Sequence, residues 1–193
     1  MTWAGAEVAS RVIFTDVAQK SQHIARARVC DLFLDTPECN AHTTAADVLW
    51  SGTPLLTLPR YNYKMCSRMA ASILKGALPK NEEGALAAKD LIAGSDDEYE
   101  AMAVKLALDC RYKDGKATGR LSQLRKILYE ARWSSGLFDT KRWVRDLEEA
   151  YDIAWKKWER GEGGDIWLKK VPQSQAQAKA KAQAHRSAPK ALC

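Results

Sequence analysis

Short apolar runs alternate with segments of helical periodicity through the first half of the chain. The expected strands are residues 11–15, 31–36 and 54–59, and the expected helices are residues 21–30, 43–52 and 63–76. Continuous apolar strands that alternate with helices are typical of a parallel sheet covered by helices on both faces. The sequence therefore predicts an α/β, Rossmann-like fold, whose ligands bind outside the carboxyl ends of the strands.

The second half of the chain predicts further helices. A surface loop is expected after Gly76, and Ser95 and Glu98 have the spacing of a capping box at the start of a helix. A basic amphipathic helix is expected over residues 120–133, and a last helix over residues 141–160. The apolar side chains of the last helix recur at spacings of three and four, from Trp143 to Trp158, which predicts that this face packs on the core or on a neighbouring lobe.

The composition and the charge pattern disfavour several classes of protein. The 193 residues suffice for one packed domain with appendages, and the net charge is +6. Four of these charges belong to a tail without acids, and the body interleaves both signs, which disfavours a nucleic-acid-binding domain. We expect no signal peptide, membrane span or metal cluster, because no long apolar run and no zinc-type cysteine spacing occurs. The five cysteines are expected to be reduced, and a cytoplasmic or nuclear location is predicted.

A polar turn precedes the expected helix that follows the second strand. One interpretation is structural: Thr44 and Asp47 have the spacing of a capping box, worth about 1 kcal/mol. The other is functional. A helix N-terminus at the end of a parallel strand offers free amides and a positive dipole to a phosphate, and His42, Thr43 and Thr44 would add donors. The residues alone leave both interpretations open.

A second polar group follows the first expected strand. Lys20, His23 and Arg26 recur at a spacing of three and share a helix face if the segment is helical. A solvated basic patch is the simpler interpretation. Because both polar groups follow neighbouring strands of one parallel pattern, however, we expect them to meet at one sheet edge and to form a nucleotide diphosphate site. No P-loop, dinucleotide fingerprint or G-x-S-x-G elbow occurs, so a sugar nucleotide fits best.

The chain resembles the C-terminal lobe of the protein O-GlcNAc transferases, which have the GT-B glycosyltransferase fold. The matching stretches run in order from about Arg11 to Glu159 and are RVIFTDVAQKSQHIAR, DLFLDTPECNAHTTAADVLWSGTPLLTLP, SRMAAS, DEYEAMAVKLA and SSGLFDTKRWVRDLEEAYDIAWKKWE. The second stretch is long and specific. The resemblance implies the C-terminal half of a GT-B enzyme, followed by C-terminal helices, that helps to transfer N-acetylglucosamine to Ser and Thr of intracellular proteins.

The resemblance also implies a ligand for each polar group. In this family the lobe holds UDP, so the backbone of Ala18 and the guanidinium of Arg26 would bind the uracil, with His23 against it. Lys20 and Asp47 would bind the ribose. The turn formed by His42, Thr43 and Thr44 would hold the pyrophosphate. The donor would be UDP-GlcNAc, with no cofactor and no metal.

The chain departs from the family pattern at three places. Gln19 stands where the family usually has Pro, and Ala41 stands where it usually has Gly, which we expect to strain the turn by about 1 kcal/mol. Residues 76–89 look longer than their family counterpart and are expected to be a surface insertion. The predicted organisation is a lead-in over residues 1–10, a UDP-sugar-binding lobe with C-terminal helices over 11–160, and a disordered basic tail over 161–193.

Several interpretations of the function follow. The family's N-terminal catalytic lobe and tetratricopeptide superhelix are not seen in this sequence, so they would be partners and the isolated chain would be nearly inactive, with no catalytic residue of its own. The chain could instead be a non-catalytic nucleotide-binding or protein-interaction module. A related branch shares this lobe and uses GDP-fucose. A fragmentary gene model is a further possibility.

Overall fold

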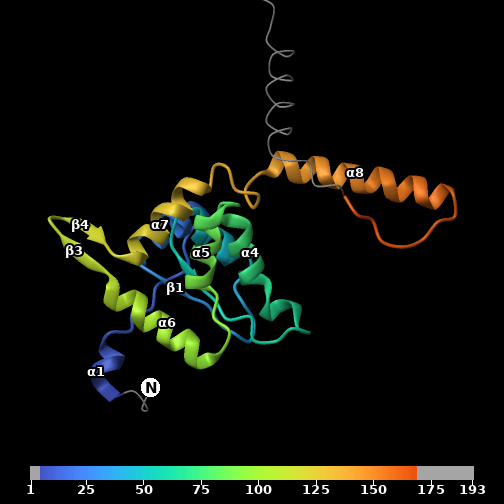
Figure 1. Cartoon of the computed structure of the whole chain (residues 1–193). Helices are drawn as coiled ribbons and strands as arrows, with labels where there is room; N and C mark the ends of the chain where they lie inside the picture. The colour runs from blue at the N-terminus through green and yellow to red at the C-terminus, as the bar shows by residue number, and fades with distance from the viewer. Residues whose placement is uncertain (1–4, 169–193) are drawn as a thin grey trace, which may run out of the picture. The chain divides into compact units, whose positions relative to one another are not determined.

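The computed structural model describes residues 5–168 of the chain (Figure 1). Its elements are, in chain order, α1 (Gly5–Ser10), α2 (Lys20–Ala27), β1 (Phe33–Leu34), α3 (Thr43–Trp50), β2 (Leu55–Leu56), the 3₁₀ helix η1 (Met65–Ser67), α4 (Met69–Ala77), α5 (Glu82–Leu91), α6 (Asp96–Asp109), β3 (Arg111–Lys113), β4 (Lys116–Thr118), α7 (Arg120–Ala131) and α8 (Thr140–Glu159). The chain divides into two compact units, and the first of them ends at Asp139. Most of the tail predicted to be disordered, from residue 169 on, lies outside the described residues.

A small parallel sheet lies at the centre of the first unit. In it β1 pairs with β2, with Phe33 opposite Leu55, and Thr57 forms a parallel bridge with Ile92. The predicted α/β fold with a parallel sheet is therefore confirmed, but both strands are shorter than the apolar runs that contain them. Prolines lie close to the ends of both strands, at Pro37, Pro54 and Pro59, and proline cannot donate to a ladder.

The strand expected over residues 11–15 was wrong. The segment has no regular structure. The backbone amides of Arg11 and Val12 donate hydrogen bonds to carbonyls of α1. The side chains of Ile13 and Phe14 are more than four-fifths exposed. The amides of β1 donate to carbonyls of the β2 segment, and β-branched residues form a strand only where a neighbouring strand supplies the ladder.

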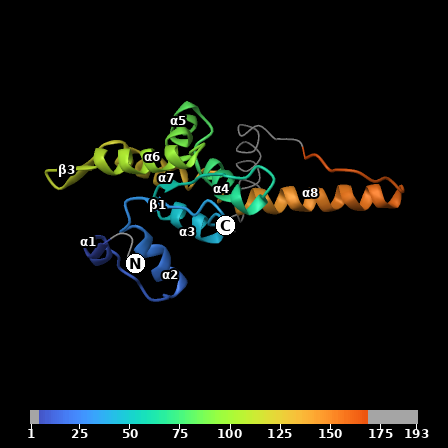
Figure 2. The same cartoon turned by 90° about the horizontal axis from the view of Figure 1, so that it is seen from below.

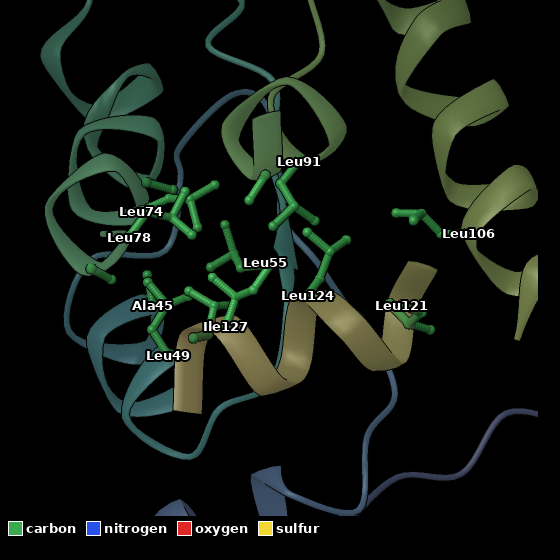
Figure 3. Close-up of a cluster of buried hydrophobic side chains, with 14 residues drawn as sticks. Ala45, Leu49, Leu55, Leu74, Leu78, Leu91, Leu106, Leu121, Leu124 and Ile127 are labelled. Carbon is green, nitrogen blue, oxygen red and sulfur yellow. The ribbon is translucent and has the colours of Figure 1, made fainter. Parts of the chain in front are cut away.

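The hydrophobic core surrounds β2. Leu55 lies in the middle of the cluster in Figure 3, with Leu74 and Leu91 on one side and Leu124 and Ile127 on the other. These side chains come from α4, α5 and α7, so three helices pack on one strand. Burial of each leucine contributes about 2 kcal/mol. The core fixes β2 and α3, which together position the candidate site.

The surface loop expected over residues 76–89 was also wrong, whereas the greater length relative to the family stays a prediction. The second half of this segment forms the first turns of α5, whose N-cap Asn81 accepts a hydrogen bond from the Gly84 amide at 3.0 Å. Ala87 and Leu91 of this helix are fully buried in the core. An Ala-rich helix carries a weak apolar pattern, because its buried face is made of small side chains.

Several further predictions for the first unit agree with the structure. Ser95 caps α6, since its Oγ accepts from the Glu98 amide at 3.2 Å, and Gly52 ends the turn after α3 with a φ of 85°. The expected amphipathic helix is α7. The turn between α6 and α7 is a two-stranded hairpin, β3 and β4, closed at Asp114 and Gly115, both of which have positive φ.

The second unit begins with α8, a continuous helix of 20 residues that confirms the predicted last helix. None of its residues is buried, and Trp143 and Trp158 are 60% and 70% exposed. The predicted packing of its apolar face on a core or a neighbouring lobe stays a prediction. Among those residues, no helix combines the length and the apolar character needed to span a membrane.

Candidate functional site

The N-terminus of α3 follows the turn after β1. The helix begins at Thr43, its N-cap is His42, and no side chain caps it. Its first helical hydrogen bond runs from the Ala46 amide to the His42 carbonyl at 3.3 Å. The capping box of Thr44 and Asp47 was therefore wrong, because the helix begins too early for Thr44 to be the N-cap.

This helix end provides donors for an anion. The amides of Thr43, Thr44 and Ala45 precede the first helical hydrogen bond, so they have no acceptor within the helix. The side chains of His42 and Thr43 are exposed, and Thr44 is half-buried. The positive end of the helix dipole adds to these donors. The arrangement is suited to a phosphate group.

The backbone of the turn is unstrained at Ala41. Among the described residues, Asp114 is the only one other than glycine with a positive φ. Ala41 therefore adopts an ordinary backbone conformation, and the expected strain of about 1 kcal/mol was wrong. Its side chain packs against the edge of the core, which glycine could not do.

The carboxylate of Asp35 holds this turn against the sheet. It is 4% exposed and accepts from the Ala41 amide at 2.7 Å and from the Thr57 hydroxyl at 2.6 Å. The Asp35 carbonyl accepts from the Tyr99 hydroxyl at 2.7 Å. Burial, and then the charge of Asp35, raise the pKa of Tyr99 to about 12. Sequence reasoning missed Asp35, although an acid directly after an apolar strand was a usable signal.

The rest of the turn is closed by its own polar groups. The side-chain amide of Asn40 donates to the Thr36 carbonyl at 3.0 Å. The Thr36 hydroxyl donates to the Cys39 carbonyl at 2.6 Å. The backbone amide of Asn40 donates to the Cys66 carbonyl at 2.8 Å. Asn40 is 4% exposed, so the turn is built as part of the folded core and not as a loose loop.

Lys20 and Asp47 come together where α2 packs beside α3 (Figure 2). The Lys20 ammonium lies 3.9 Å from an oxygen of Asp47, and the carboxylate side chain is 23% exposed. The hydroxyl of Thr53, in the segment after α3, also donates to the carbonyl of Ala27 at the end of α2. Lys20 and Asp47 thus meet through helix packing, because the first of the expected strands does not form. The expected convergence of the basic residues of α2 with the turn before α3 stays a prediction.

The residues expected to bind the uracil lie before and along α2. Ala18 is half-buried in the segment before the helix, and His23 is half-buried within it. The Arg26 guanidinium donates to the Asp16 carbonyl at 2.7 Å and so braces this segment. Their assignment to the base stays a prediction. Among the described residues, no group of three or more His, Cys, Asp or Glu side chains is arranged to hold a metal ion.

A cluster of charges holds the outer side of the turn. Glu38 accepts from Arg60 at 2.7 Å and from the Tyr61 hydroxyl at 2.9 Å, and Lys64 lies 3.5 Å away. The Arg60 guanidinium lowers the pKa of Glu38, and Tyr61 adds to this effect. Arg60 also pairs with Asp96 at the start of α6. The turn is thus linked to two further elements of the first unit.

Comparison with known sequences relates the chain to one family of enzymes. The model of glycosyl transferase family 41 matches residues 3–147. The chain is 38% identical over 152 residues to a UDP-N-acetylglucosamine–peptide N-acetylglucosaminyltransferase of Caenorhabditis elegans, covering 79% of this chain and 12% of the relative. It is 43% identical over 146 residues to a probable enzyme of the same name from Arabidopsis thaliana, covering 75% of this chain and 13% of that relative.

A solved structure extends this similarity to the fold. An O-GlcNAc transferase variant of Thermobaculum terrenum aligns with a TM-score of 0.60 at 25% identity, over 77% of this chain and 25% of that one. The chain spans about an eighth of the length of the two relatives described above. The structural match agrees with the predicted GT-B origin of the fold. The chain belongs to glycosyl transferase family 41.

Proposed function

We propose that the chain is the donor-binding part of a protein O-GlcNAc transferase and that it binds the UDP moiety of UDP-GlcNAc. The single observation that carries this proposal is the Lys20–Asp47 pair beside the open N-terminus of α3. The resemblance assigns these two residues to the ribose and the α3 turn to the pyrophosphate. Their proximity supports one continuous site for a nucleoside diphosphate.

The chemistry of such a site is electrostatic. As the sugar leaves, negative charge builds on the UDP diphosphate, and the first-turn amides of α3 would stabilise it together with the Thr43 and Thr44 hydroxyls. Lys20 would add a positive charge nearby. These donors are held by Asp35 and the core, so they need little reorganisation when the charge develops.

The acceptor side of the reaction would come from elsewhere. Protein Ser and Thr hydroxyls are the proposed acceptors, and an N-terminal catalytic lobe, with or without a tetratricopeptide superhelix, is the proposed partner that presents them. In this proposal the chain binds the donor without a metal and has little activity alone. Acceptor proteins would be intracellular, in the cytoplasm or the nucleus.

Calorimetric titration of UDP into the purified chain tests the donor site. We expect a Kd between about 10 µM and 1 mM. Lys20→Ala and Asp47→Ala should each weaken UDP binding about tenfold, because each removes a charged hydrogen-bonding group. Lys89→Ala, an exposed charge on α5, is the matched control and should leave the Kd unchanged.

Two outcomes would contradict the proposal. The absence of measurable heat at millimolar UDP, with a chain that remains folded by circular dichroism, excludes the donor site. Tighter binding of GDP than of UDP would instead favour a fucosyltransferase-type relative. A titration with both nucleotides on the same preparation separates these cases.

A further inference from the structure

Cys66 lies beside Cys39 at the base of the turn that precedes α3. The backbone amide of Asn40 donates to the Cys66 carbonyl at 2.8 Å, and the Cys66 thiol lies 3.8 Å from the Glu38 carbonyl oxygen. Residue 66 therefore contacts the chain on both sides of Cys39.

The thiol of Cys66 also influences the ionisation of Cys39. The pKa of the Cys39 thiol is raised, first by loss of hydration and then by the charge of Cys66 and a hydrogen bond with it. Both cysteines are free thiols, and Cys39 is exposed while Cys66 is half-buried. The raised pKa lowers the thiolate fraction of Cys39 and so slows its first reaction with an oxidant. The pair nevertheless has one sulfur that an oxidant can reach and a second cysteine beside it that can complete a disulfide.

We propose that Cys39 and Cys66 form a reversible disulfide that cross-links the turn before His42 to η1. The bond would join two segments that already share a backbone hydrogen bond, so it would fix the turn in its present arrangement. The backbone amide of Ala41 is held on the other side by Asp35 at 2.7 Å. Oxidation would then hold the turn from both sides.

The oxidant is a small disulfide such as oxidised glutathione. The Cys39 thiolate attacks one sulfur of that disulfide, its S–S bond breaks, and one glutathione thiolate leaves. The Cys66 thiolate then attacks the Cys39 sulfur, the protein S–S bond forms, and the second glutathione leaves. Two electrons pass from the protein to glutathione, and the two thiol protons end on the two glutathione molecules.

The consequence for the ligand rests on the proposed donor site. The turn presents His42 and Thr43 to the expected pyrophosphate, so a cross-link three residues before His42 would preorganise it. We expect oxidation to tighten UDP binding about threefold. The cross-link itself does not depend on that function, and the two claims can therefore fail separately.

Peptide mapping of the whole chain tests the cross-link. The chain is incubated with oxidised glutathione, its remaining thiols are alkylated, and it is digested with trypsin without reduction. We expect the peptide of residues 29–60 joined to the peptide of residues 65–68, and we expect dithiothreitol to separate them. Cys30 shares the first peptide, so Cys30→Ser is the matched control and should keep the cross-link. Cys39→Ser and Cys66→Ser should lose it.

Four outcomes test the cross-link and its consequence for the ligand. A chain that carries glutathione on Cys39 but never forms the joined peptide overturns the proposal, as does a cross-link that persists in Cys66→Ser. A joined peptide without any change in UDP affinity overturns the preorganisation and leaves the disulfide standing. A joined peptide in a chain that binds no UDP in either redox state overturns the donor site alone.

Discussion

The buried carboxylate of Asp35 joins the turn before α3 to the sheet through two short hydrogen bonds. Asp35→Ala removes both acceptors and leaves the amide of Ala41 and the hydroxyl of Thr57 without partners. We expect it to lower the free energy of unfolding by about 3 kcal/mol, measured by urea denaturation. Asp35→Asn is the matched variant, because its carbonyl can accept from Ala41 while its amide donates to Thr57. If Asp35→Asn lowered the free energy of unfolding as much as Asp35→Ala does, the two hydrogen bonds would not be the source of the stability.

Tyr99 makes the fold sensitive to alkaline pH. Its folded-state pKa of about 12 is above its ordinary value of 10.0, because burial and the charge of Asp35 favour the neutral phenol. The unfolded chain therefore loses this proton first as the pH rises. The stability that Tyr99 contributes is fully present below pH 10 and is lost as the pH rises toward 12.

Tyr99→Phe checks this pH dependence. The substitution removes the hydrogen bond to the Asp35 carbonyl and should cost about 1 kcal/mol at pH 7. It should also flatten the loss of stability above pH 10, measured by denaturation at a series of pH values. Tyr112→Phe, at an exposed position on β3, should leave both quantities unchanged. An unaltered alkaline profile in Tyr99→Phe would show that other groups cause it.

At the scale of elements, the first turn of α5 packs tightly against Pro79 in the segment before it. A Cβ at Gly84 would lie 2.0 Å from the Pro79 carbonyl oxygen. Helix propensity alone favours Gly84→Ala by about 1 kcal/mol, whereas the clash forces the backbone apart and costs about 1–3 kcal/mol or more. We expect a net loss of stability in thermal denaturation. Gly163→Ala, whose Cβ meets nothing within 4 Å, is the control and should be neutral.

The start of α3 shows how a local pattern can mislead about an element. Thr44 and Asp47 have capping-box spacing, yet the helix begins at Thr43 and no side chain caps it. The turn before it is fixed by Asp35, which also accepts from Thr57, and by the contact of Asn40 with Cys66. Thr57 and Cys66 belong to later segments of the chain. Tertiary hydrogen bonds thus set where the helix begins, and its free amides follow from that.

For the whole molecule, the core lies in the first unit, and no residue of α8 is buried. A chain truncated after Asp139 should therefore keep its Tm within about 2 °C, measured by circular dichroism. Truncation after Ala131 should lower the Tm by about 5 °C or more, because it removes Leu137 and Phe138, which pack against the core. Phe138 also lies edge-on to Trp50, with ring centroids 5.0 Å apart. A large fall in Tm on truncation after Asp139 would contradict the division of the chain into two units.

The sequence by itself determined the elements whose signals are local. The apolar runs around Phe33 and Leu55 predicted strands in a parallel sheet, Ser95 and Glu98 predicted a cap, and the long periodic pattern after Lys141 predicted α8. Strand propensity, capping and helical periodicity each depend on residues within a few positions of one another. Lys20 was also recognised from its position after an expected strand, whereas only the family resemblance implied a binding role for Asp47.

The tertiary structure alone decided which of these segments acquired partners. Residues 11–15 have the composition of a strand and remain outside the sheet, and the Ala-rich α5 has a weak pattern and lies in the core. Asp35 closes the turn because Ala41 and Thr57 approach it from different parts of the chain. A hydrogen-bond partner or a packing surface that comes from a distant segment leaves no periodic trace in the local sequence, so only the fold reveals it.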